Sequence, residues 1–284
     1  MSTSMSKARL SSIPPESLRG KNVFLRVDFN VPLELQQEGN IVVKEDARIR
    51  AELPTITHLM QCGAKTILCS HLGRPRGVRD RRLSLAPVAA RLNEYCPGVT
   101  FVGDCVGEGR RMAVRGMQPG QVLVLENVRY YNEEYLNNSD FAAELAEGMD
   151  IYVNDAFGSS HRVHASVVGV AQHIPRCVMG FLMTNELLFL GSALDHPNRP
   201  LAALVGGAKV SSKLDVMLSL LRRVDKLLVG GAMVYTFLRA LGHDVGESLV
   251  EEGMIPVAKE ILEFAQKNSI TLVLGQDSLV VQCG

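Results

Sequence analysis

Four apolar runs of this sequence are each followed by side chains that could bind an anion. The side chains after these runs are Asp28, Asn30, His71, Arg74, Arg76, Arg129, His161, Arg162 and His164. Arg48 falls near the start of a helical pattern that follows the first run. Like charges gathered in one crevice repel each other unless an anion neutralises them, and guanidinium groups suit bidentate capture of phosphate or carboxylate. The pattern therefore predicts a site for a small acidic substrate, with a phosphorylated one favoured.

His161 and His164 raise the alternative of a metal site. An arginine stands between them, and no set of carboxylates lies nearby in the sequence. Zinc and other transition metals usually need three or four such ligands. The anion site remains the stronger interpretation of this segment.

The stretch LVGGAKVSSKLD (204–215) is a second candidate for phosphate binding. Gly206 and Gly207 would let the backbone approach a ligand closely where a strand ends. The pattern predicts that Lys209 and Lys213 lie on one face of the helix that follows, whose free N–H groups favour a phosphate. Taken alone, the stretch fits a tight turn and a solvated helix equally well.

One strand and helix later, LLVGGAMVYTF (227–237) repeats the same design with Gly230 and Gly231. An apolar, glycine-rich slot of this kind could hold a purine. The two stretches together predict a nucleotide site in the second half of the chain.

Two familiar phosphate motifs are absent from the sequence. No G-x-x-x-x-G-K-[ST] frame and no G-x-G-x-x-G frame occurs, and GAKT at 63–66 has no upstream glycine in register. The sequence therefore argues against a P-loop NTPase and against a dinucleotide-binding dehydrogenase.

Alternating strands and helices would position these residues. Apolar runs at 22–29, 65–70, 121–126 and 150–155 predict buried parallel strands, and helical patterns lie near 47–61, 85–95 and 140–148, the last with Ser139 as its N-cap. Further strands are expected near 201–205, 226–230 and 270–274, after an apolar helix at 181–196. In parallel sheets, ligands bind at the carboxyl ends of the strands. The pattern predicts an α/β protein with two such sheets joined by a helix.

Composition narrows the class of protein. The chain has 284 residues, which suits two domains at about 150 residues each. It contains 30 basic and 30 acidic residues, so bulk charge favours neither nucleic acid nor membrane as a partner. No apolar stretch approaches the roughly 18 residues that a membrane span requires. The cysteine spacing and the lack of an apolar signal core favour a reducing, cytoplasmic location, and an organellar form stays open.

The motifs resemble one family in order and spacing. RVDFNVP, DARIRAELPTI, SHLGRP, LENVRYYNEE, NDAFGSSHRVH, LVGGAKVSSKL and LLVGGAMVYTFL, which extend over about residues 19–274, are similar to phosphoglycerate kinase. The resemblance implies two Rossmann-like domains: a phosphoglycerate-binding domain at 1–180, an interdomain helix at 181–198 and a partial nucleotide-binding domain at 199–284. It further implies a monomer that transfers a phosphoryl group between 1,3-bisphosphoglycerate and ADP, with Mg²⁺, to give 3-phosphoglycerate and ATP.

The resemblance also implies roles for individual residues. The phosphoglycerate would be held by Asp28, Asn30, Arg48, His71, Arg74, Arg129 and Arg162, with His161 helping to assemble the basic patch. The nucleotide site would comprise Gly206, Gly207, Lys209, Lys213, Gly230, Gly231 and Tyr235. Arg48 and Lys209 would act on the phosphoryl group in transfer.

The sequence ends in QDSLVVQCG, where the family pattern continues through further strands and a GGGD turn that serves the nucleotide phosphates and magnesium. From this we expect phosphoglycerate binding to survive and catalysis to be lost or severely reduced. Two interpretations stay open: a phosphotransferase, and a non-catalytic phosphoglycerate-binding or regulatory product of the same kind of gene.

Overall fold

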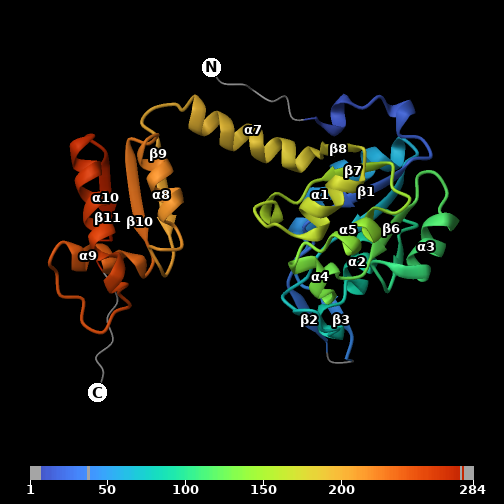
Figure 1. Ribbon diagram of the computed structural model, residues 1–284, viewed down its shortest axis with the longest axis horizontal. Coiled ribbons are helices and arrows are strands. Elements are labelled where there is room, and N and C mark those ends of the chain that lie inside the picture. The colour runs from blue at the N-terminus through green and yellow to red at the C-terminus, as the bar shows by residue number, and fades with distance from the viewer. Residues whose placement is uncertain (1–7, 37–38, 276, 278–284) are drawn as a thin grey trace. The chain divides into compact units, whose positions relative to one another are not determined.

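The computed structural model describes residues 8–36, 39–275 and 277. The chain forms two compact units, residues 1–188 and 189–284. The boundary between them falls inside helix α7 (Phe181–Asp195), which is drawn in yellow in Figure 1. Each unit has its own parallel sheet, as the alternating sequence pattern predicts, with two apolar cores in the first unit and one in the second.

The first unit contains a six-stranded sheet in the order β5-β6-β4-β1-β7-β8, and every pairing in it is parallel. The strands are β1 (Asn22–Arg26), β4 (Lys65–Cys69), β5 (Thr100–Val102), β6 (Val122–Leu125), β7 (Ile151–Asn154) and β8 (Arg176–Met179). A separate antiparallel hairpin pairs β2 (Leu33–Leu35) with β3 (Ile41–Val43). The four predicted strands of this unit are confirmed, although β1 ends at Arg26, three residues before the predicted end.

Helices cover both faces of this sheet. They are α1 (Ala47–Gln61), α2 (Ala86–Tyr95), α3 (Gly107–Gly116), α4 (Asn132–Tyr135), α5 (Ser139–Ala146) and α6 (Val170–His173). Side chains of α1 and α2 pack with Val23 and Leu25 of β1, whereas those of α3 and α5 pack with Phe24 on the opposite face. Successive side chains of β1 thus point to opposite faces of the sheet and pack into two separate cores.

The predicted N-cap of α5 is one residue off. Ser139 is the first residue of the helix, and the cap is Asn138, whose side-chain oxygen accepts a hydrogen bond from the N–H of Phe141 at 2.9 Å. Asparagine and serine are similarly good caps. The Asn-Asn-Ser run therefore contains adjacent candidates for the N-cap, and in the structure the cap is Asn138.

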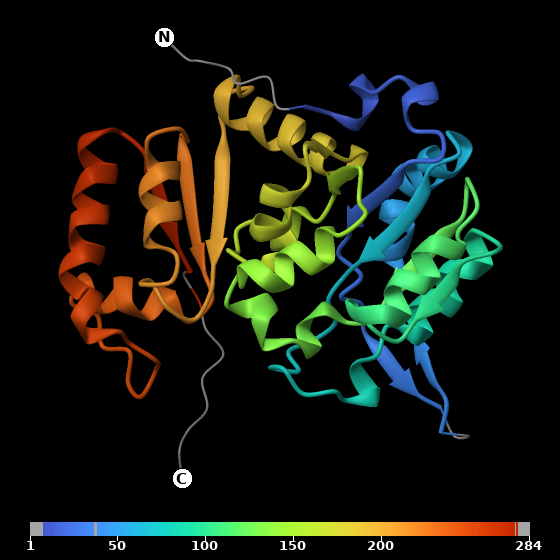
Figure 2. The same cartoon turned by 45° about the vertical axis from the view of Figure 1, so that its right-hand side comes forward.

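The second unit has three parallel strands in the order β11-β10-β9: β9 (Ala202–Gly206), β10 (Lys226–Gly230) and β11 (Thr271–Leu274). Its helices are α8 (Leu214–Leu221), α9 (Met233–Ala240) and α10 (Ile255–Lys267). Figure 2 shows these helices on the same side of the strands. They bury Val205, Leu227 and Val229, whereas Leu204, on the other face, is 75% exposed.

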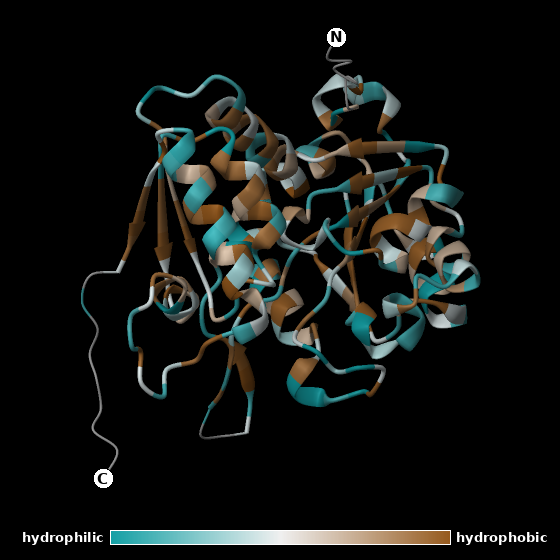
Figure 3. Ribbon diagram, turned by 60° about the vertical axis from the view of Figure 1, so that its left-hand side comes forward, coloured by the Kyte–Doolittle hydropathy of each residue, from teal (hydrophilic) through white to brown (hydrophobic). Residues whose placement is uncertain are grey.

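Much of the strand ribbon in both units is drawn in brown in Figure 3, the colour of hydrophobic residues. Among the described residues, no helix combines the length and the hydropathy that crossing a bilayer would take.

Candidate functional site

Residues from several strand ends meet at a cavity of about 250 Å³ in the first unit. Its lining comprises Asp28, Asn30, Arg48, His71, Gly73, Arg74, Arg129, Gly158, Ser159 and Arg162. Seven of these were singled out from the sequence. They meet because β1, β4, β6 and β7 are parallel neighbours, so that their carboxyl ends lie at one edge of the sheet. Four arginines and one carboxylate give the cavity a positive charge.

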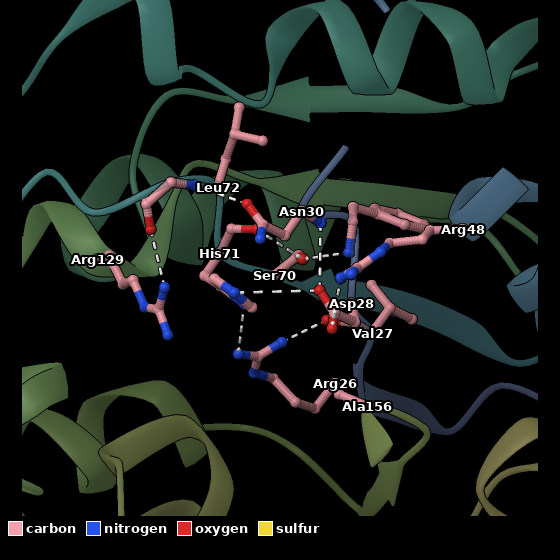
Figure 4. A network of polar contacts seen from close by, with 12 residues as sticks. Arg26, Val27, Asp28, Asn30, Arg48, Ser70, His71, Leu72, Arg129 and Ala156 are labelled. Atoms are coloured by element: carbon pink, nitrogen blue, oxygen red, sulfur yellow. Dashed lines mark hydrogen bonds and ion pairs between the residues drawn. The ribbon is translucent and has the colours of Figure 1, made fainter. Parts of the chain in front are cut away.

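Asp28 lies at the centre of this arrangement, as Figure 4 shows. Its Oδ2 lies 2.9 Å from Nη1 of Arg48, and its Oδ1 accepts a hydrogen bond from the N–H of Asn30 at 3.2 Å. The Arg48 side chain is about half exposed. Asp28 therefore orients a guanidinium that remains open to the cavity.

His71 is a buried, neutral donor rather than a cation. Arg26 donates from Nη2 to its Nδ1 at 3.2 Å, and because a guanidinium can only donate, the proton of the imidazole must sit on Nε2. That Nε2 lies 4.0 Å from Oδ1 of Asp28. Burial, followed by the charges of Arg26, Arg129 and other arginines, lowers the pKa of His71 well below its ordinary value. His71 can therefore offer an N–H to a ligand without adding charge.

Arg129 is held at the end of β6 by the backbone. Its Nη1 donates to the carbonyl of Gly73 at 2.8 Å, and its guanidinium carbon lies 5.7 Å from the ring centre of Tyr135. Its buried Nε has no hydrogen-bond partner among the described residues. Burial lowers the pKa of Arg129, which means that its charge lacks full compensation. An anion bound in the cavity would compensate the charge of Arg129.

The loop after β4 is fixed by amide side chains. Asn30 accepts a hydrogen bond at Oδ1 from the N–H of Gly73 at 2.8 Å, and buried Asn127 donates to the carbonyl of Leu72 at 2.7 Å. Gly73 has φ of +60°, and an added Cβ would lie 2.7 Å from a methyl carbon of Leu83. Glycine is therefore required here, and Asn30 serves the shape of the cavity as well as its lining.

Sequence reasoning missed several residues of the site. Arg26 is fully buried in β1 and also donates from Nε to Ser166 at 2.9 Å. Ser166 in turn donates to buried Glu134 at 2.7 Å. A charged residue inside the otherwise apolar run NVFLRV was the signal available for Arg26. Gly73, Gly158 and Ser159, which line the cavity, carried no comparable signal.

The structure does not bring His161 or His164 into the cavity lining. His161 is exposed, whereas His164 is buried with its Nδ1 3.6 Å from Glu134 and its ring 5.5 Å from that of Tyr135. Among the residues that the structure describes, no group of three or more histidines, cysteines or carboxylates could hold a metal ion. The two histidines therefore separate into a surface residue and a packing residue.

The predicted glycine pairs of the second unit lie side by side. Gly206 of β9 is in register with Gly230 of β10, and the N–H of Gly207 donates to the carbonyl of Gly230 at 3.3 Å. Gly231 has φ of +72°, and an added Cβ would lie 2.7 Å from the carbonyl oxygen of Gly207. The two strand exits thus form one backbone surface without side chains, at the start of α9. Tyr235, half-buried, lies in the first turn of that helix.

The prediction that Lys209 and Lys213 share a helical face is wrong. Helix α8 begins at Leu214, so that Lys213 is its N-cap and Lys209 lies in the preceding loop. The loop is turned by Ser211, which donates from N and Oγ to Glu251 at 3.1 and 2.6 Å. Lys213 still reaches the glycines, since an added Cβ on Gly207 would lie 3.7 Å from its Cε. Both lysines are exposed, and Glu251 is a residue that the sequence did not reveal.

Comparisons with known proteins show to which family the chain belongs. Residues 13–283 match the family described as Phosphoglycerate kinase. The chain is 48% identical over 279 residues to a phosphoglycerate kinase of Dictyoglomus turgidum and 49% identical over 277 residues to one of Synechococcus elongatus, covering 98% and 97% of this chain and 69% and 68% of theirs.

Solved structures give the same result. A phosphoglycerate kinase of Coxiella burnetii matches with a TM-score of 0.78 and 37% identity, over 94% of this chain and 65% of that one. The enzyme of Pyrococcus horikoshii matches with a TM-score of 0.79 and 31% identity, over 94% and 67%. The chain therefore spans about two thirds of the length of these relatives. On sequence and fold, this chain belongs to the phosphoglycerate kinase family.

Proposed function

We propose that this protein is a phosphotransferase with a carboxyl group as acceptor, which interconverts 1,3-bisphosphoglycerate and ADP with 3-phosphoglycerate and ATP. The observation that carries the proposal is the cavity of the first unit, where four arginines, Asn30 and neutral His71 surround a single carboxylate. Its volume of about 250 Å³ suits a small ligand, and its excess charge favours a multiply anionic one.

The individual roles follow from chemistry and position. Arg74, Arg129 and Arg162 would bind the phosphate and carboxyl oxygens, since arginine matches both groups bidentately. Asp28 and His71 would fix the hydroxyl and carboxyl end of the phosphoglycerate. Arg48, which Asp28 orients at 2.9 Å, would contact the phosphoryl group in transfer.

The second unit would hold the nucleotide. The backbone surface of Gly206, Gly207, Gly230 and Gly231 permits close approach of a flat base or a phosphate chain. Lys213 lies beside this surface, and Lys209 follows Gly207 by two residues in the loop. We assign Lys209 to the transferring phosphoryl group, Lys213 to the other phosphates, and Tyr235 to the region of the base. Magnesium would reach the chain on the nucleotide phosphates, because Mg²⁺ usually binds through substrate phosphates and a few protein oxygens.

Transfer from an acyl phosphate requires little acid–base chemistry, because the leaving carboxylate is already stable. Positioning of the reactants and neutralisation of the phosphoryl oxygens would supply most of the rate enhancement. The arginine-lined cavity suits that requirement. We further propose a monomer acting in glycolysis in the cytoplasm. Cys62, Cys69, Cys96, Cys105 and Cys177 are free cysteines, as expected of a protein in a reducing compartment.

Formation of ATP by the full chain from 1,3-bisphosphoglycerate and magnesium ADP tests the proposal. We expect Arg48→Ala to lower kcat by about 10³-fold or more, as loss of an arginine finger does. Arg50→Ala is the matched control, since Arg50 lies on the same helix, pairs with Asp46 and does not line the cavity. Equal turnover by the two variants would contradict the role of Arg48. Absence of turnover in folded wild-type protein that still binds 3-phosphoglycerate would support the non-catalytic interpretation instead.

A further inference from the structure

Two carboxyl groups are buried together behind the cavity. Glu52 lies one helical turn after Arg48 on α1, and Asp155 follows directly after β7; both side chains are completely buried. Thr55, three residues after Glu52 on the same helix, donates its hydroxyl to Asp155, and the charge of Asp155 is among the causes that raise the pKa of Glu52. Two carboxylates cannot both ionise in such a position without a large electrostatic cost. One of them must therefore carry a proton or meet a cation.

Asp155 has the partners that an ionised carboxylate requires. Its Oδ2 accepts a hydrogen bond from the hydroxyl of Thr55, and its Oδ1 accepts one from the N–H of Met183 at 2.7 Å. Met183 lies in the first turn of α7, where exposed N–H groups and the helix dipole favour a negative charge. Thr55 also accepts a hydrogen bond from the N–H of Phe181 at 3.1 Å. Asp155 and Thr55 thus cap α7.

The contact between Asp155 and α7 is tight. An added Cβ on Gly180, the residue before the helix, would lie 2.2 Å from Cγ of Asp155. Gly180 is also held by its own N–H, which donates to the carbonyl of Asn154 at 3.0 Å. No larger residue fits there without displacing the carboxylate, so the position of Asp155 and the start of α7 are linked.

Glu52 has the opposite surroundings. Its Oε1 accepts one long hydrogen bond, 3.3 Å, from the N–H of Asp28, and its buried Oε2 has no partner among the described residues. The charged groups that face it are Asp155 from the end of β7 and Asp28 from the end of β1, both acidic, and Asp28 is itself paired with Arg48. A proton on Oε2 would supply the missing partner by donating to Asp155.

We propose that Glu52 is a positioning residue that is protonated at neutral pH, donates from Oε2 to Asp155 and accepts from the backbone of Asp28, so that one shared proton links the cavity to the start of α7. Burial, followed by the charge of Asp155, raises the pKa of Glu52 well above its ordinary value. Burial also raises the pKa of Asp155, although its N–H and hydroxyl donors act against this. Helix α1 carries all three parts of the link: Arg48 at the cavity, Glu52 in the pair and Thr55 at the cap.

The sign of the pH dependence follows from the raised pKa of Glu52. Its contribution to stability is fully present below the ordinary glutamate pKa of 4.5 and is lost as the pH rises toward the folded-state pKa. Glu52→Gln keeps a donor and an acceptor but cannot ionise. We therefore expect the Tm of this variant, relative to wild type, to rise by at least about 2 °C between pH 5 and pH 8.

Glu144→Gln is the matched control, because Glu144 is an exposed helix residue in α5. Its Tm relative to wild type should stay constant over the same range. If the Tm difference between Glu52→Gln and wild type also stays constant from pH 5 to pH 8, the proposal is overturned. Infrared difference spectra supply a readout that does not depend on folding energy. Wild type minus Glu52→Gln at pH 7 should show the C=O band of a buried carboxylic acid, and carboxylate bands alone would overturn the assignment.

The predicted effect on ligand binding rests on the proposed function. The protonation of Glu52 does not depend on that function. Glu52→Leu, which removes both hydrogen bonds, should weaken binding of 3-phosphoglycerate at least about fivefold, because Asp28 loses its backbone acceptor. Glu52→Gln should restore the affinity. If the infrared band is present and both variants bind like wild type, the shared proton stands and its link to the cavity is wrong. If wild type binds no 3-phosphoglycerate, it is the proposed function that fails.

Discussion

The sheet of the first unit is covered by helices on both faces, whereas the described helices of the second unit cover one face of its three strands. The difference extends to the two candidate sites. In the first unit, buried polar side chains such as Arg26 and Asn127 hold the cavity residues from behind. In the second unit, exposed Lys213 lies beside a surface of backbone glycines.

This contrast indicates two ways to make a phosphate site. A two-sided sheet can bury a polar network and fix its charged side chains before the ligand arrives, at the cost of desolvating them. A glycine surface needs no such network, because backbone N–H groups are positioned by the strands themselves. Variants should therefore damage the first site through lost side-chain partners and the second through lost space.

The largest expected effect concerns the buried network of the first unit. Arg26→Met removes the donor to His71 and to Ser166 and leaves the buried carboxylate of Glu134 with less compensation. We expect the free energy of unfolding of the first unit to fall by about 3–5 kcal/mol. Urea unfolding followed by peptide-resolved hydrogen exchange measures this. Arg115→Met, at an exposed position of α3, is the control, and an equally small loss of unfolding free energy in both variants would contradict a structural network behind the cavity.

A pair of glycines with the same backbone angle sharpens the contrast. Gly231 has φ of +72° with the carbonyl oxygen of Gly207 2.7 Å from an added Cβ, whereas Gly148 of the first unit has φ of +73° with nothing within 4 Å. Gly148→Ala should cost about 1 kcal/mol from backbone strain alone. Gly231→Ala should cost about 3 kcal/mol, because steric overlap is added. Thermal unfolding of both variants measures how much the close contact between the strand exits adds to the loss of stability. Equal losses of stability would mean that the strand exits are not in contact.

Neighbouring residues of β9 test the one-sided cover of the second sheet. Val205 is 7% exposed and Leu204 75% exposed, on opposite faces of one strand. Val205→Ala should destabilise the second unit by about 1–2 kcal/mol, and Leu204→Ala should change it by less than about 0.5 kcal/mol. Hydrogen exchange of the β10 peptide, read for each variant, gives both values. A larger loss from Leu204→Ala would show that this face is covered in solution.

The smallest expected effect is a pH dependence at the edge of the first unit. Hydrogen bonds from Tyr95 and Arg91 lower the pKa of Asp46 to about 2. A lowered pKa means that the stabilisation is present above the ordinary value of 3.8 and is lost as the pH falls toward 2. Asp46→Asn should therefore flatten the acid side of the stability profile between pH 4 and pH 2. An unchanged slope in that window would show that these hydrogen bonds do not persist in solution.

The first site could be predicted from the sequence better than the second, because the carboxyl ends of parallel strands always lie at the same edge of a sheet. Once β1, β4, β6 and β7 are recognised as parallel, their exits must share an edge, and Asp28, His71, Arg129 and Arg162 come together without further information. Helix α1 was placed at its observed bounds for a related reason, since its apolar spacing faces one core.

Partners that depend on tertiary contacts could not be predicted. No sequence pattern marks Glu52 or Glu134 as buried, yet both are fully buried against partners over 20 residues away in sequence. The loop at Lys209 was mistaken for a helix because the bond from Ser211 to Glu251 spans 40 residues. The short strands β5 and β8 were missed because their outer residues are exposed at the sheet edges.

Calorimetric titration of 3-phosphoglycerate into the full chain tests the central claim most directly, that the first unit holds a preassembled anion site. Arg162→Ala removes a cavity arginine, and Arg115→Ala removes an exposed arginine outside the cavity. We expect saturable binding by wild type and Arg115→Ala, and at least about a tenfold loss of affinity in Arg162→Ala, because a charge-assisted hydrogen bond contributes about 1.5–3 kcal/mol. Equal affinity in all three proteins, or no binding by folded wild type, would contradict that claim.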